Sequence, residues 1–160
     1  MTSPATHLQW RTFEEMSVAE LHGVLLLRCQ VFVLEQACAY ADIDGRDPAA
    51  LHLLARANDR RADDRLAGCA RVFSLREQAP AWTVGRVAVA EAHRGSGLGR
   101  RLMLEVLAEI GRRDGSAAIE LSAQAHLERF YASLGFSRVS PDYPEDGIPH
   151  CRMRRAHTGG

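Results

Sequence analysis

The stretch Val84–Leu104, which reads VGRVAVAEAHRGSGLGRRLML, decides the fold of this chain. It opens as a β-branched run, passes through a turn with three glycines, and leaves as an amphipathic helix. A strand that feeds a helix through glycines presents unpaired backbone N–H groups and the positive end of the helix dipole to one spot. The sequence therefore predicts an anion site at this turn, and phosphate suits it best.

The residue types within the turn support the same prediction. A Cβ at Gly95, Gly97 or Gly99 would hold a phosphate away from the backbone. Side-chain charge around the same point comes from three arginines: Arg94, Arg100 and Arg101.

Two other phosphate motifs fit this turn less well. A nucleotide P-loop needs a lysine after its second glycine, and no such lysine follows here. A dinucleotide fingerprint needs Gly-x-Gly-x-x-Gly. Gly95 and Gly97 match it, but Arg100 stands where the third glycine belongs. Glu120 lies near the distance expected of a ribose-binding acid, so this alternative is weakened but stays open.

The spacing Arg94-x-x-Gly97-x-Gly99 resembles the pyrophosphate-binding motif of the GNAT superfamily of N-acetyltransferases, which bind acetyl-CoA. A second segment, Gln124–Phe136, resembles the later helix of that family, which ends in Tyr-x-x-x-Gly-Phe. Gln124 stands where the family usually has Asn, a departure that keeps an amide.

Three further segments resemble the ElaA-type branch of the superfamily: Arg28–Gln36, Asp42–Asp47 and Glu145–His150. The resemblance runs from about Leu8 to Arg154. It implies an α/β fold of the mixed α+β kind, in which helices flank a central, mostly antiparallel sheet with a splayed parallel strand pair.

Composition narrows the function classes. The 160 residues are expected to form one domain, 1–160, with a core at about 8–155. Lys+Arg and Asp+Glu both number 20, so no nucleic acid or membrane partner is expected. The chain has no apolar run of spanning length and no signal-peptide pattern, so a cytoplasmic location is expected. The four cysteines lack metal-ligand spacing, which favours reduced thiols and no bound metal.

Hydrophobic periodicity and turn residues predict the order of elements. The strand at 118–122 follows a helical crossover, so it should run parallel to the strand at 82–89. The expected elements are a strand at 8–13, a helix from Ser17, a hairpin of 51–57 and 65–75, a central strand at 82–89, a helix at 99–113, a strand at 118–122, a helix at 127–134, and a last hairpin from 136 to 155 with its loop at 142–150.

The first helix carries charge in unusual places. Ser17 followed by Glu20 is a capping box, which predicts the helix start. Helical spacing then places Arg28 and Glu35 on an apolar stripe. Charges at core-like positions need a reason. Either they face a substrate cleft, or the helix turns another side inward, or the two charges pair or reach solvent.

A polar loop follows, with three aspartates at 42, 44 and 47. Their spacing suggests calcium, but Gly45 comes too early for an EF-hand, so no metal is expected. The resemblance implies that this loop helps to wall the acceptor site.

For the cofactor, the resemblance implies acetyl-CoA, with its diphosphate on the glycine turn and its pantetheine arm along the strand before it. The expected contacts are Val87, Ala88, Val89, Arg94, Gly95, Ser96, Gly97, Leu98, Gly99, Arg100, Gln124, Phe130 and Tyr131.

Acyl transfer to an amine needs an acid for the departing thiolate and a base for the amine. Tyr131 matches the family's tyrosine near the cofactor sulfur; the alternative is a tyrosine that only packs against the sheet. Glu35 is the preferred base because it breaks the apolar stripe. The other candidates for the base are Glu120, Asp146 and His150. The expected substrate-binding residues are Arg28, Phe32, Glu35, Asp146 and His150.

These observations favour an acetyl-CoA-dependent N-acetyltransferase that acts on a primary amine of a small molecule or peptide, as a monomer or homodimer. Direct transfer in a ternary complex is favoured, because neither Cys29 nor Cys69 has a base in the sequence pattern. Two alternatives stay open. One is a non-catalytic acyl-CoA-binding sensor. The other is an acyl-homoserine-lactone synthase type of enzyme, because Arg28-x-x-Val31-Phe32 also resembles that group.

Overall fold

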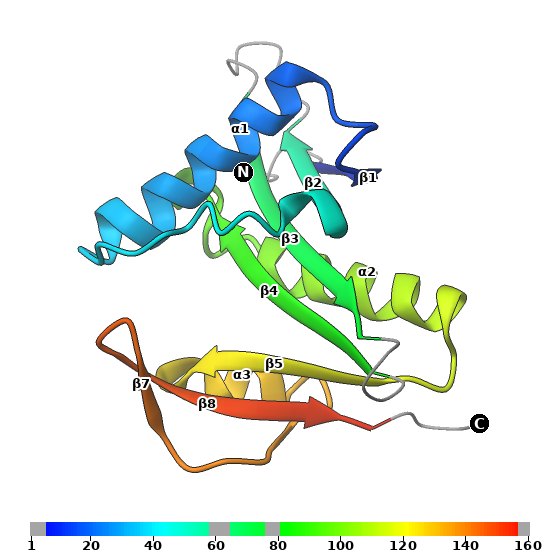
Figure 1. Cartoon of the computed structure of the whole chain (residues 1–160), viewed down its shortest axis with the longest axis vertical. Helices are drawn as coiled ribbons and strands as arrows, with labels where there is room; N and C mark the ends of the chain where they lie inside the picture. Colours follow the sequence, from blue (N-terminus) through cyan, green and yellow to red (C-terminus); the bar gives the residue numbers. More distant parts are fainter. Residues whose placement is uncertain (1–5, 58–64, 76–80, 157–160) are drawn as a thin grey trace. The chain divides into compact units, whose positions relative to one another are not determined.

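The computed structural model describes residues 6–57, 65–75 and 81–156 (Figure 1). The expected turn at 58–64 and most of the connection at 76–81 lie outside the described residues. The strands are β1 (Thr6–Thr12), β2 (Leu51–Ala57), β3 (Leu66–Ser74), β4 (Ala81–Val89), β5 (Ala118–Gln124), β6 (Ser137–Arg138), β7 (Tyr143–Glu145) and β8 (Ile148–Arg155). The α-helices are α1 (Val18–Arg28), α2 (Leu98–Arg113) and α3 (Glu128–Ala132). The shorter helical segments are η1 (Cys29–Glu35), η2 (Asp47–Ala49), η3 (Glu91–His93) and η4 (Ala125–Leu127).

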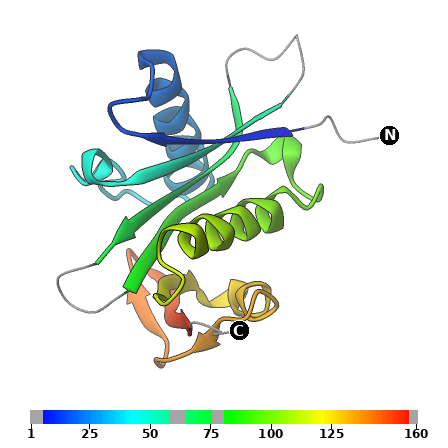
Figure 2. The same ribbon diagram turned by 90° about the vertical axis from the view of Figure 1, so that its right-hand side faces the viewer.

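Within the described ranges the strands follow the order β1-β2-β3-β4-β5-β8-β6, and β7 pairs with β8. β1 lies antiparallel beside β2 (Figure 2). β8 is antiparallel to β5, β6 and β7. β4 and β5 run parallel. The predicted fold class, a mostly antiparallel mixed sheet with one parallel pair, is therefore confirmed.

Two compact units make up the chain: residues 1–71 with 86–103, and residues 72–85 with 104–160. The single domain stays a prediction.

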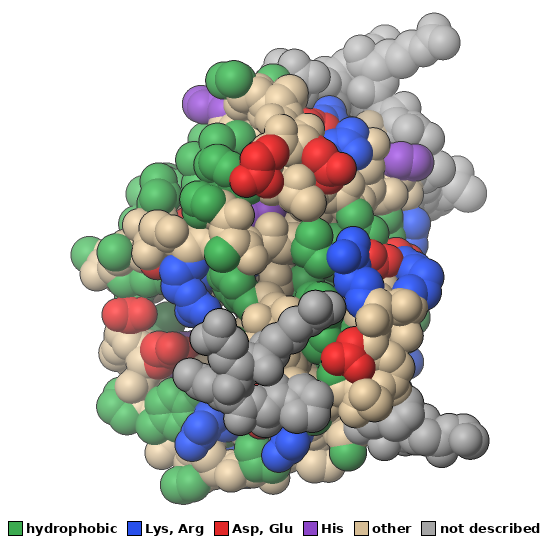
Figure 3. All heavy atoms as spheres, turned by 45° about the vertical axis from the view of Figure 1, so that its right-hand side comes forward, with side chains coloured by type: hydrophobic (Ala, Val, Ile, Leu, Met, Phe, Trp, Pro, Cys, Tyr) green, Lys and Arg blue, Asp and Glu red, His purple; other side chains and the backbone are tan. Residues whose placement is uncertain are grey.

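No helix among the described residues is long and apolar enough to cross a membrane. On the face drawn in Figure 3, acidic and basic side chains adjoin one another instead of forming a field of one sign.

β4 changes character near its middle. Its parallel ladder with β5 runs from Ala81 to Val84, and the strand continues to Val89. Just beyond the ladder, Arg86 has a φ of +51°. A bulky residue in this left-handed region is rare in a strand and is typical of a bulge. The regular extended backbone is thus interrupted where the ladder ends.

The capping box that begins α1 is present as predicted. The Glu20 amide donates to Ser17 Oγ at 3.1 Å, and the Ser17 amide donates to Glu20 Oε2 at 2.8 Å. From this start, α1 buries Val24 and Leu27 in a core cluster with Leu54 and Cys69 of the sheet. The buried face of α1 therefore includes Leu27 beside Val24.

The segment that follows α1 departs from the period of an α-helix. Cys29–Glu35 is a π-helix, not a continuation of α1. Its i→i+5 turns are wider, so residues seven apart no longer return to one face. Arg28 is accordingly 1% exposed, whereas the Glu35 side chain is 36% exposed. The shared stripe predicted for these two charges does not form.

α1 and the first turns of α2 cover opposite faces of β3. Cys69 packs in the cluster beneath α1. At the neighbouring Gly68 a side chain would point to the opposite face of β3, because side chains alternate along a strand. A Cβ on Gly68 would lie 2.9 Å from Leu102 Cδ1 of α2 and 3.0 Å from the Ala88 carbonyl oxygen of β4. Glycine at this position lets α2 approach the sheet closely.

α2 presents the predicted inward face. Leu102, Val106 and Ile110 are fully buried, as expected from their spacing, and Leu107 is half-buried. Met103 joins them in the core. The helix that follows the glycine turn is therefore anchored by apolar contacts along its length.

A network of buried ion pairs ties the polar loop to α1 and β3. Arg28 donates from Nε to Asp42 Oδ2 at 2.9 Å and from Nη1 to Asp47 Oδ1 at 2.7 Å. Arg71 of β3 donates to the same Asp47 oxygen at 2.9 Å and to Asp44 Oδ2 at 2.8 Å. Of the alternatives for Arg28, pairing is the one that the structure shows.

The same loop also reaches the irregular point of β4. Arg86 Nε lies 2.8 Å from Asp42 Oδ1. Its guanidinium also stands over the Tyr40 ring, 5.3 Å from the centroid. The hydroxyl of Tyr40 donates to the same Asp42 oxygen, at 2.8 Å. Asp42 thus links α1 to the one residue of β4 with a positive φ among those described.

The charges shift one another's proton affinities. Hydrogen bonds from Arg71 hold the pKa of Asp44 well below its usual value. Burial alone would raise the pKa of Asp47, but hydrogen bonds from Arg28 and Arg71 outweigh it and lower that pKa. Burial lowers the pKa of His52, whose Nε2 lies 2.9 Å from the Asp47 carbonyl oxygen. Because a carbonyl only accepts, the neutral ring donates from Nε2.

We expect Gly68→Ala to destabilise the protein by about 1–3 kcal/mol, because the added methyl meets Leu102 and the backbone of β4. Gly111→Ala is the matched control: Gly111 lies in α2 with open space at its Cβ, so this change should stabilise by about 0.5–1 kcal/mol. Urea unfolding of both variants measures the difference. Equal effects would contradict the close approach at Gly68.

We expect Asp47→Asn to cost about 3–5 kcal/mol, because it leaves two buried guanidiniums short of their shared carboxylate. Asp142→Asn, which removes a carboxylate from an exposed pair with Arg138, should cost about 1 kcal/mol or less. Urea midpoints at neutral pH compare the two. A similar loss in both would mean that the network adds little stability.

The network should also make the stability of the folded protein depend on pH. The pKa values of Asp44 and Asp47 are lower in the folded chain than in the unfolded one. Their contribution is therefore complete above the unfolded pKa of about 4 and is lost as pH falls through the folded values. Urea midpoints measured from pH 6 downward should fall below about pH 4, and the fall should be shallower in Asp47→Asn.

Candidate functional site

The glycine turn has the backbone conformation that an anion site needs. Gly95 and Gly97 have φ values of +73° and +80°, a region that side chains disfavour. Nothing lies within 4 Å of an added Cβ at either residue, so the space over the turn is open. α2 begins directly afterwards, at Leu98. The strand–turn–helix order that the sequence predicts is present.

The amides of this turn are available to a ligand. Among the described residues, no hydrogen bond is recorded for the N–H groups of Gly95, Ser96, Gly97, Leu98 or Gly99. The Arg101 amide donates to the Gly97 carbonyl at 3.1 Å. Unpaired N–H groups at a helix N-terminus favour an anion, both through hydrogen bonds and through the helix dipole.

The arginines of the turn have internal partners. Arg94 donates from Nε to the Val89 carbonyl at 3.1 Å and from Nη2 to Glu35 Oε2 at 2.6 Å. Arg101 donates to the Thr6 carbonyl and hydroxyl of β1. The Arg94–Glu35 pair is exposed on both sides, and such surface pairs contribute about 1 kcal/mol or less. Arg94 can therefore exchange Glu35 for a phosphate at small cost.

The strand before the turn is partly accessible. Ala88 is buried, and the side chains of Val87 and Val89 are half-buried. Phe32 of η1 packs against the core cluster that contains Ala88. The expected contacts of these residues with pantetheine or substrate stay predictions.

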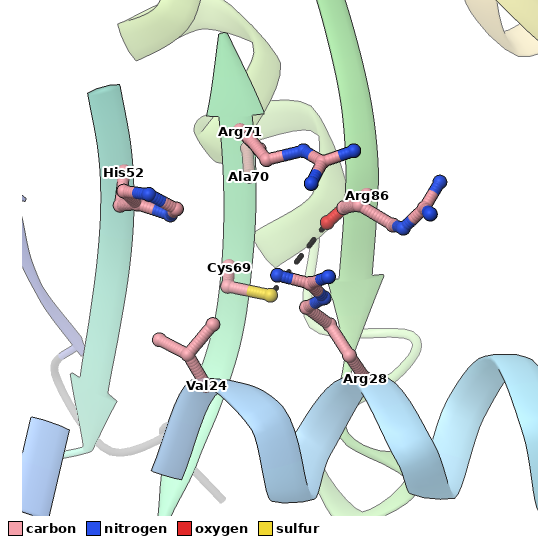
Figure 4. A pocket seen from close by; sticks show the side chains of 7 residues that line it. All are labelled: Val24, Arg28, His52, Cys69, Ala70, Arg71 and Arg86. Atoms are coloured by element: carbon pink, nitrogen blue, oxygen red, sulfur yellow. Dashed lines mark hydrogen bonds between the residues drawn. The ribbon is translucent and has the colours of Figure 1, made fainter. Parts of the chain in front are cut away.

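A small pocket lies beside the charged network (Figure 4). Its lining residues are Val24, Arg28, His52, Cys69, Ala70, Arg71 and Arg86. It has no enclosed space for even one water molecule, whereas ligand sites typically have volumes of about 300–1,000 Å³. The neighbouring aspartates also pair with its arginines. It is therefore a gap between packed ion pairs and too small for a substrate.

Cys69 in this pocket is not a nucleophile. The thiol is 2% exposed, and burial raises its pKa to about 12. Its Sγ lies 3.6 Å from the Arg86 carbonyl oxygen. A thiol of this kind stays protonated at neutral pH, whereas attack on a thioester needs the thiolate.

Tyr131 is a buried phenol with a free hydroxyl. Its side chain packs edge-on against Phe130 and Phe136, with ring centroids at 5.0 and 6.1 Å. Burial raises its pKa to about 12. Nowhere in the described ranges is a hydrogen bond to this hydroxyl recorded. The phenol is therefore protonated at neutral pH and has its donor available.

The helix that carries Tyr131 is shorter than predicted. α3 spans Glu128–Ala132 and follows the 3₁₀ turn Ala125–Leu127, where one helix over 127–134 was expected. Gly135 ends the segment with a φ of +87°, as predicted for the stop. Gln124 is the last residue of β5, and Phe130 is half-buried beside Tyr131.

The predicted loop at 142–150 contains a further strand. β7 and β8 form a tight hairpin whose two central residues are Asp146 (φ +50°) and Gly147 (φ +77°). Asp-Gly between two strands is a strong hairpin signal, and the prediction of a loop at 142–150 did not take it into account. Asp146 is therefore a turn residue, and His150 lies on β8 opposite Tyr143 of β7. Their predicted contacts with substrate stay predictions.

No spacing in the sequence marks Arg71 or Arg86 as members of the charged network. The aspartate spacing pointed to a cation, and the structure supplies guanidiniums as that positive charge. In the described part of the chain, no group of three or more His, Cys, Asp or Glu residues could hold a metal ion.

Comparison with known proteins adds independent information. A family model described as "Acetyltransferase (GNAT) domain" matches residues 18–156. Protein ElaA of Escherichia coli K12 is 40% identical over 152 residues, covering 92% of this chain and 96% of that protein. Its crystal structure matches with a TM-score of 0.86 and 39% identity, over 94% of this chain and 99% of that one.

Two other solved structures are similar. An acyl-CoA N-acyltransferase from Pseudomonas aeruginosa matches with a TM-score of 0.86 and 36% identity, over 95% of this chain and 100% of that one. The AHL synthase LasI matches with a TM-score of 0.72 at 18% identity, over 97% and 91% of the two chains, which shows a shared fold only. The family model and the ElaA match both cover most of the sequence, and from them we conclude that this chain belongs to the GNAT acetyltransferase family, in the branch that includes ElaA.

Proposed function

We propose that this protein transfers an acyl group, acetyl in the first instance, from acyl-CoA to a primary amine of a small molecule or peptide. Membership of the GNAT family supports an acyltransferase. The single observation that carries the proposal is the row of unpaired amides from Gly95 to Gly99 at the start of α2. Location in the cytoplasm and a monomeric or homodimeric state stay predictions.

The residues of the turn suit the diphosphate of coenzyme A. Backbone N–H groups and the helix dipole favour a compact anion. Positive φ values at Gly95 and Gly97 keep side chains away from it. Arg94 and Arg100 add charge from either end of the turn. When bound, acyl-CoA supplies an activated acyl thioester.

Tyr131 is the proposed acid for the departing thiolate. A raised pKa of about 12 keeps its hydroxyl protonated at neutral pH. The hydroxyl has no recorded hydrogen-bond acceptor among the described residues, so its proton is not committed elsewhere. Direct transfer to the amine is proposed over an acyl-enzyme, because the thiol of Cys69 is buried and protonated.

Glu35 is one candidate for the base, and one of its oxygens pairs with Arg94. Two other functions compete with the whole proposal. A sensor would bind acyl-CoA and leave every amine unmodified. An enzyme of the acyl-homoserine-lactone synthase type would prefer an acyl-carrier protein as donor. Turnover of acetyl-CoA against acetyl-acyl-carrier protein, over a broad amine panel, distinguishes the three.

We expect Gly97→Ala to weaken coenzyme A binding at least about tenfold, or roughly 1.4 kcal/mol, because its methyl intrudes on the anion site. Gly45→Ala is the matched control, since Gly45 has a φ of +76° and equally open space. Backbone strain is then alike in both variants, and calorimetric titration with coenzyme A isolates the ligand effect. Equal affinities in the two variants would remove the turn from the binding site.

We expect Tyr131→Phe to lower kcat by about 10²–10⁴-fold with little change in KM for acetyl-CoA, because only a proton donor is lost. The urea midpoint should be unchanged, since the hydroxyl has no recorded partner in the described chain. Steady-state kinetics with acetyl-CoA and an accepted amine measures the loss. Full activity in this variant would refute the acid role.

A further inference from the structure

Four polar side chains form a connected chain on one face of the β5–β8–β7 sheet. Ser122 and Gln124 of β5 lie two residues apart, so they share a face. Gln124 is directly opposite His150 of β8, and His150 is directly opposite Tyr143 of β7. Glu145 lies two residues beyond Tyr143 and shares its face. The connected residues are Tyr143, Ser122, Glu145 and His150.

The hydrogen bonds of this chain run in one direction. Ser122 Oγ donates to Glu145 Oε2 at 2.8 Å. A serine hydroxyl has one proton, so the 2.5 Å contact between Ser122 Oγ and the Tyr143 hydroxyl is donated by Tyr143. The Tyr143 hydroxyl thus donates to Ser122, and the Ser122 hydroxyl donates to Glu145. The carboxylate also faces His150, whose Nε2 lies 3.3 Å from the same oxygen.

The backbone sets the tautomer of His150. Its Nδ1 lies 2.7 Å from the Ile148 carbonyl oxygen, which can only accept. Nδ1 therefore carries the proton, and Nε2 of the neutral ring presents a lone pair. Stacking against Tyr143, with ring planes 24° apart, also orients the imidazole. The neutral ring thus directs its basic nitrogen at the Glu145 carboxylate.

When His150 is neutral, its Nε2 and the Glu145 oxygen are two acceptors 3.3 Å apart with no donor between them. An ammonium group supplies such donors and a positive charge. The Glu145 side chain is 49% exposed, so a cation can reach it from solvent. His150 is also one strand away from Gln124, which the family resemblance assigns to the cofactor side.

We infer that His150 is the general base of the proposed reaction and that Glu145 binds the incoming ammonium and orients His150. This inference rests on the proposed function. The ammonium gives one proton to His150 Nε2, and Glu145 stabilises the resulting imidazolium. The amine lone pair then forms the N–C bond while the C–S bond breaks. Tyr131 protonates the sulfur and recovers a proton from the acylated nitrogen, and His150 releases its proton to water.

Other charged or titratable groups on β8 and the elements beside it are Glu120 on β5, His126 on η4, Arg138 on β6, and Arg152, Arg154 and Arg155 on β8 itself. The ion pairs of these residues join Arg154 to Glu120 and Arg138 to Glu128 and Asp142. Within the described ranges, the carboxylate that lies within 4 Å of the His150 ring is that of Glu145.

The test compares two acceptors with acetyl-CoA: propylamine, which is protonated at neutral pH, and 2,2,2-trifluoroethylamine, which is largely neutral there. His150→Gln should lower kcat/KM for propylamine by about 10²–10³-fold, because the amine needs a base. The loss should shrink toward unity for trifluoroethylamine. Glu145→Gln should show the same pattern with a smaller loss, about tenfold. His126→Gln, a histidine exposed on η4, is the matched control and should change neither rate.

Equal losses on both amines, or a loss no larger than that of His126→Gln, would overturn the assignment of the base. Glu35→Gln in the same assay would overturn it too, if that variant alone showed the amine-dependent pattern. No turnover of any amine by the unsubstituted protein would instead refute the proposed function itself.

A measurement without substrate tests the geometry directly. Long-range ¹H–¹⁵N NMR of the unliganded protein should show His150 with its neutral-state proton on Nδ1, because the Ile148 carbonyl holds it there. A neutral ring protonated on Nε2 would overturn the inference. Should His150→Gln fail to fold, Glu145→Gln carries the kinetic test, since its half-exposed side chain is not part of the core.

Discussion

The buried ion pairs between the 42–47 loop and the arginines of α1, β3 and β4 are the constraint on which this half of the fold depends. Arg28 could not lie in an apolar core unless its donors were met, and Asp42 and Asp47 meet them. A buried pair adds modest stability when intact, but losing one partner leaves an uncompensated charge. The network therefore chiefly fixes the position of the 42–47 loop, because the carboxylates of this loop must reach the guanidiniums.

That condition extends to the functional end of β4. Arg86 keeps an unfavourable φ of +51° while its side chain is paired to Asp42 and its carbonyl lies near the Cys69 thiol. Strained backbone persists when its surroundings over-determine it. The irregular point of β4 precedes the strand segment and the glycine turn at which the cofactor is proposed to bind. The buried ion pairs of the core are in this way coupled to the backbone conformation of β4 beside the proposed cofactor site.

Local rules predicted much of the chain correctly, because they depend on neighbours in sequence. Ser17 and Glu20 cap α1, and Leu102, Val106 and Ile110 form the inner face of α2. Errors arose where hydrogen bonding departed from the expected period. The π-turns of Cys29–Glu35 carried Glu35 away from the face of Arg28, and a strand replaced part of the loop at 142–150. A prediction that assumes 3.6 residues per turn cannot reveal a wider helical turn.

By itself the sequence determined the strand–turn–helix of Val84–Leu104, since positive φ values, open space and a helix start follow from the glycines and the apolar spacing there. It also determined the family, because those motifs are local. Only the tertiary structure decided that Arg28 is buried among aspartates and that His150 faces Glu145. Partners for a charge come from distant parts of the chain, and no spacing along the sequence reveals which ones folding brings together.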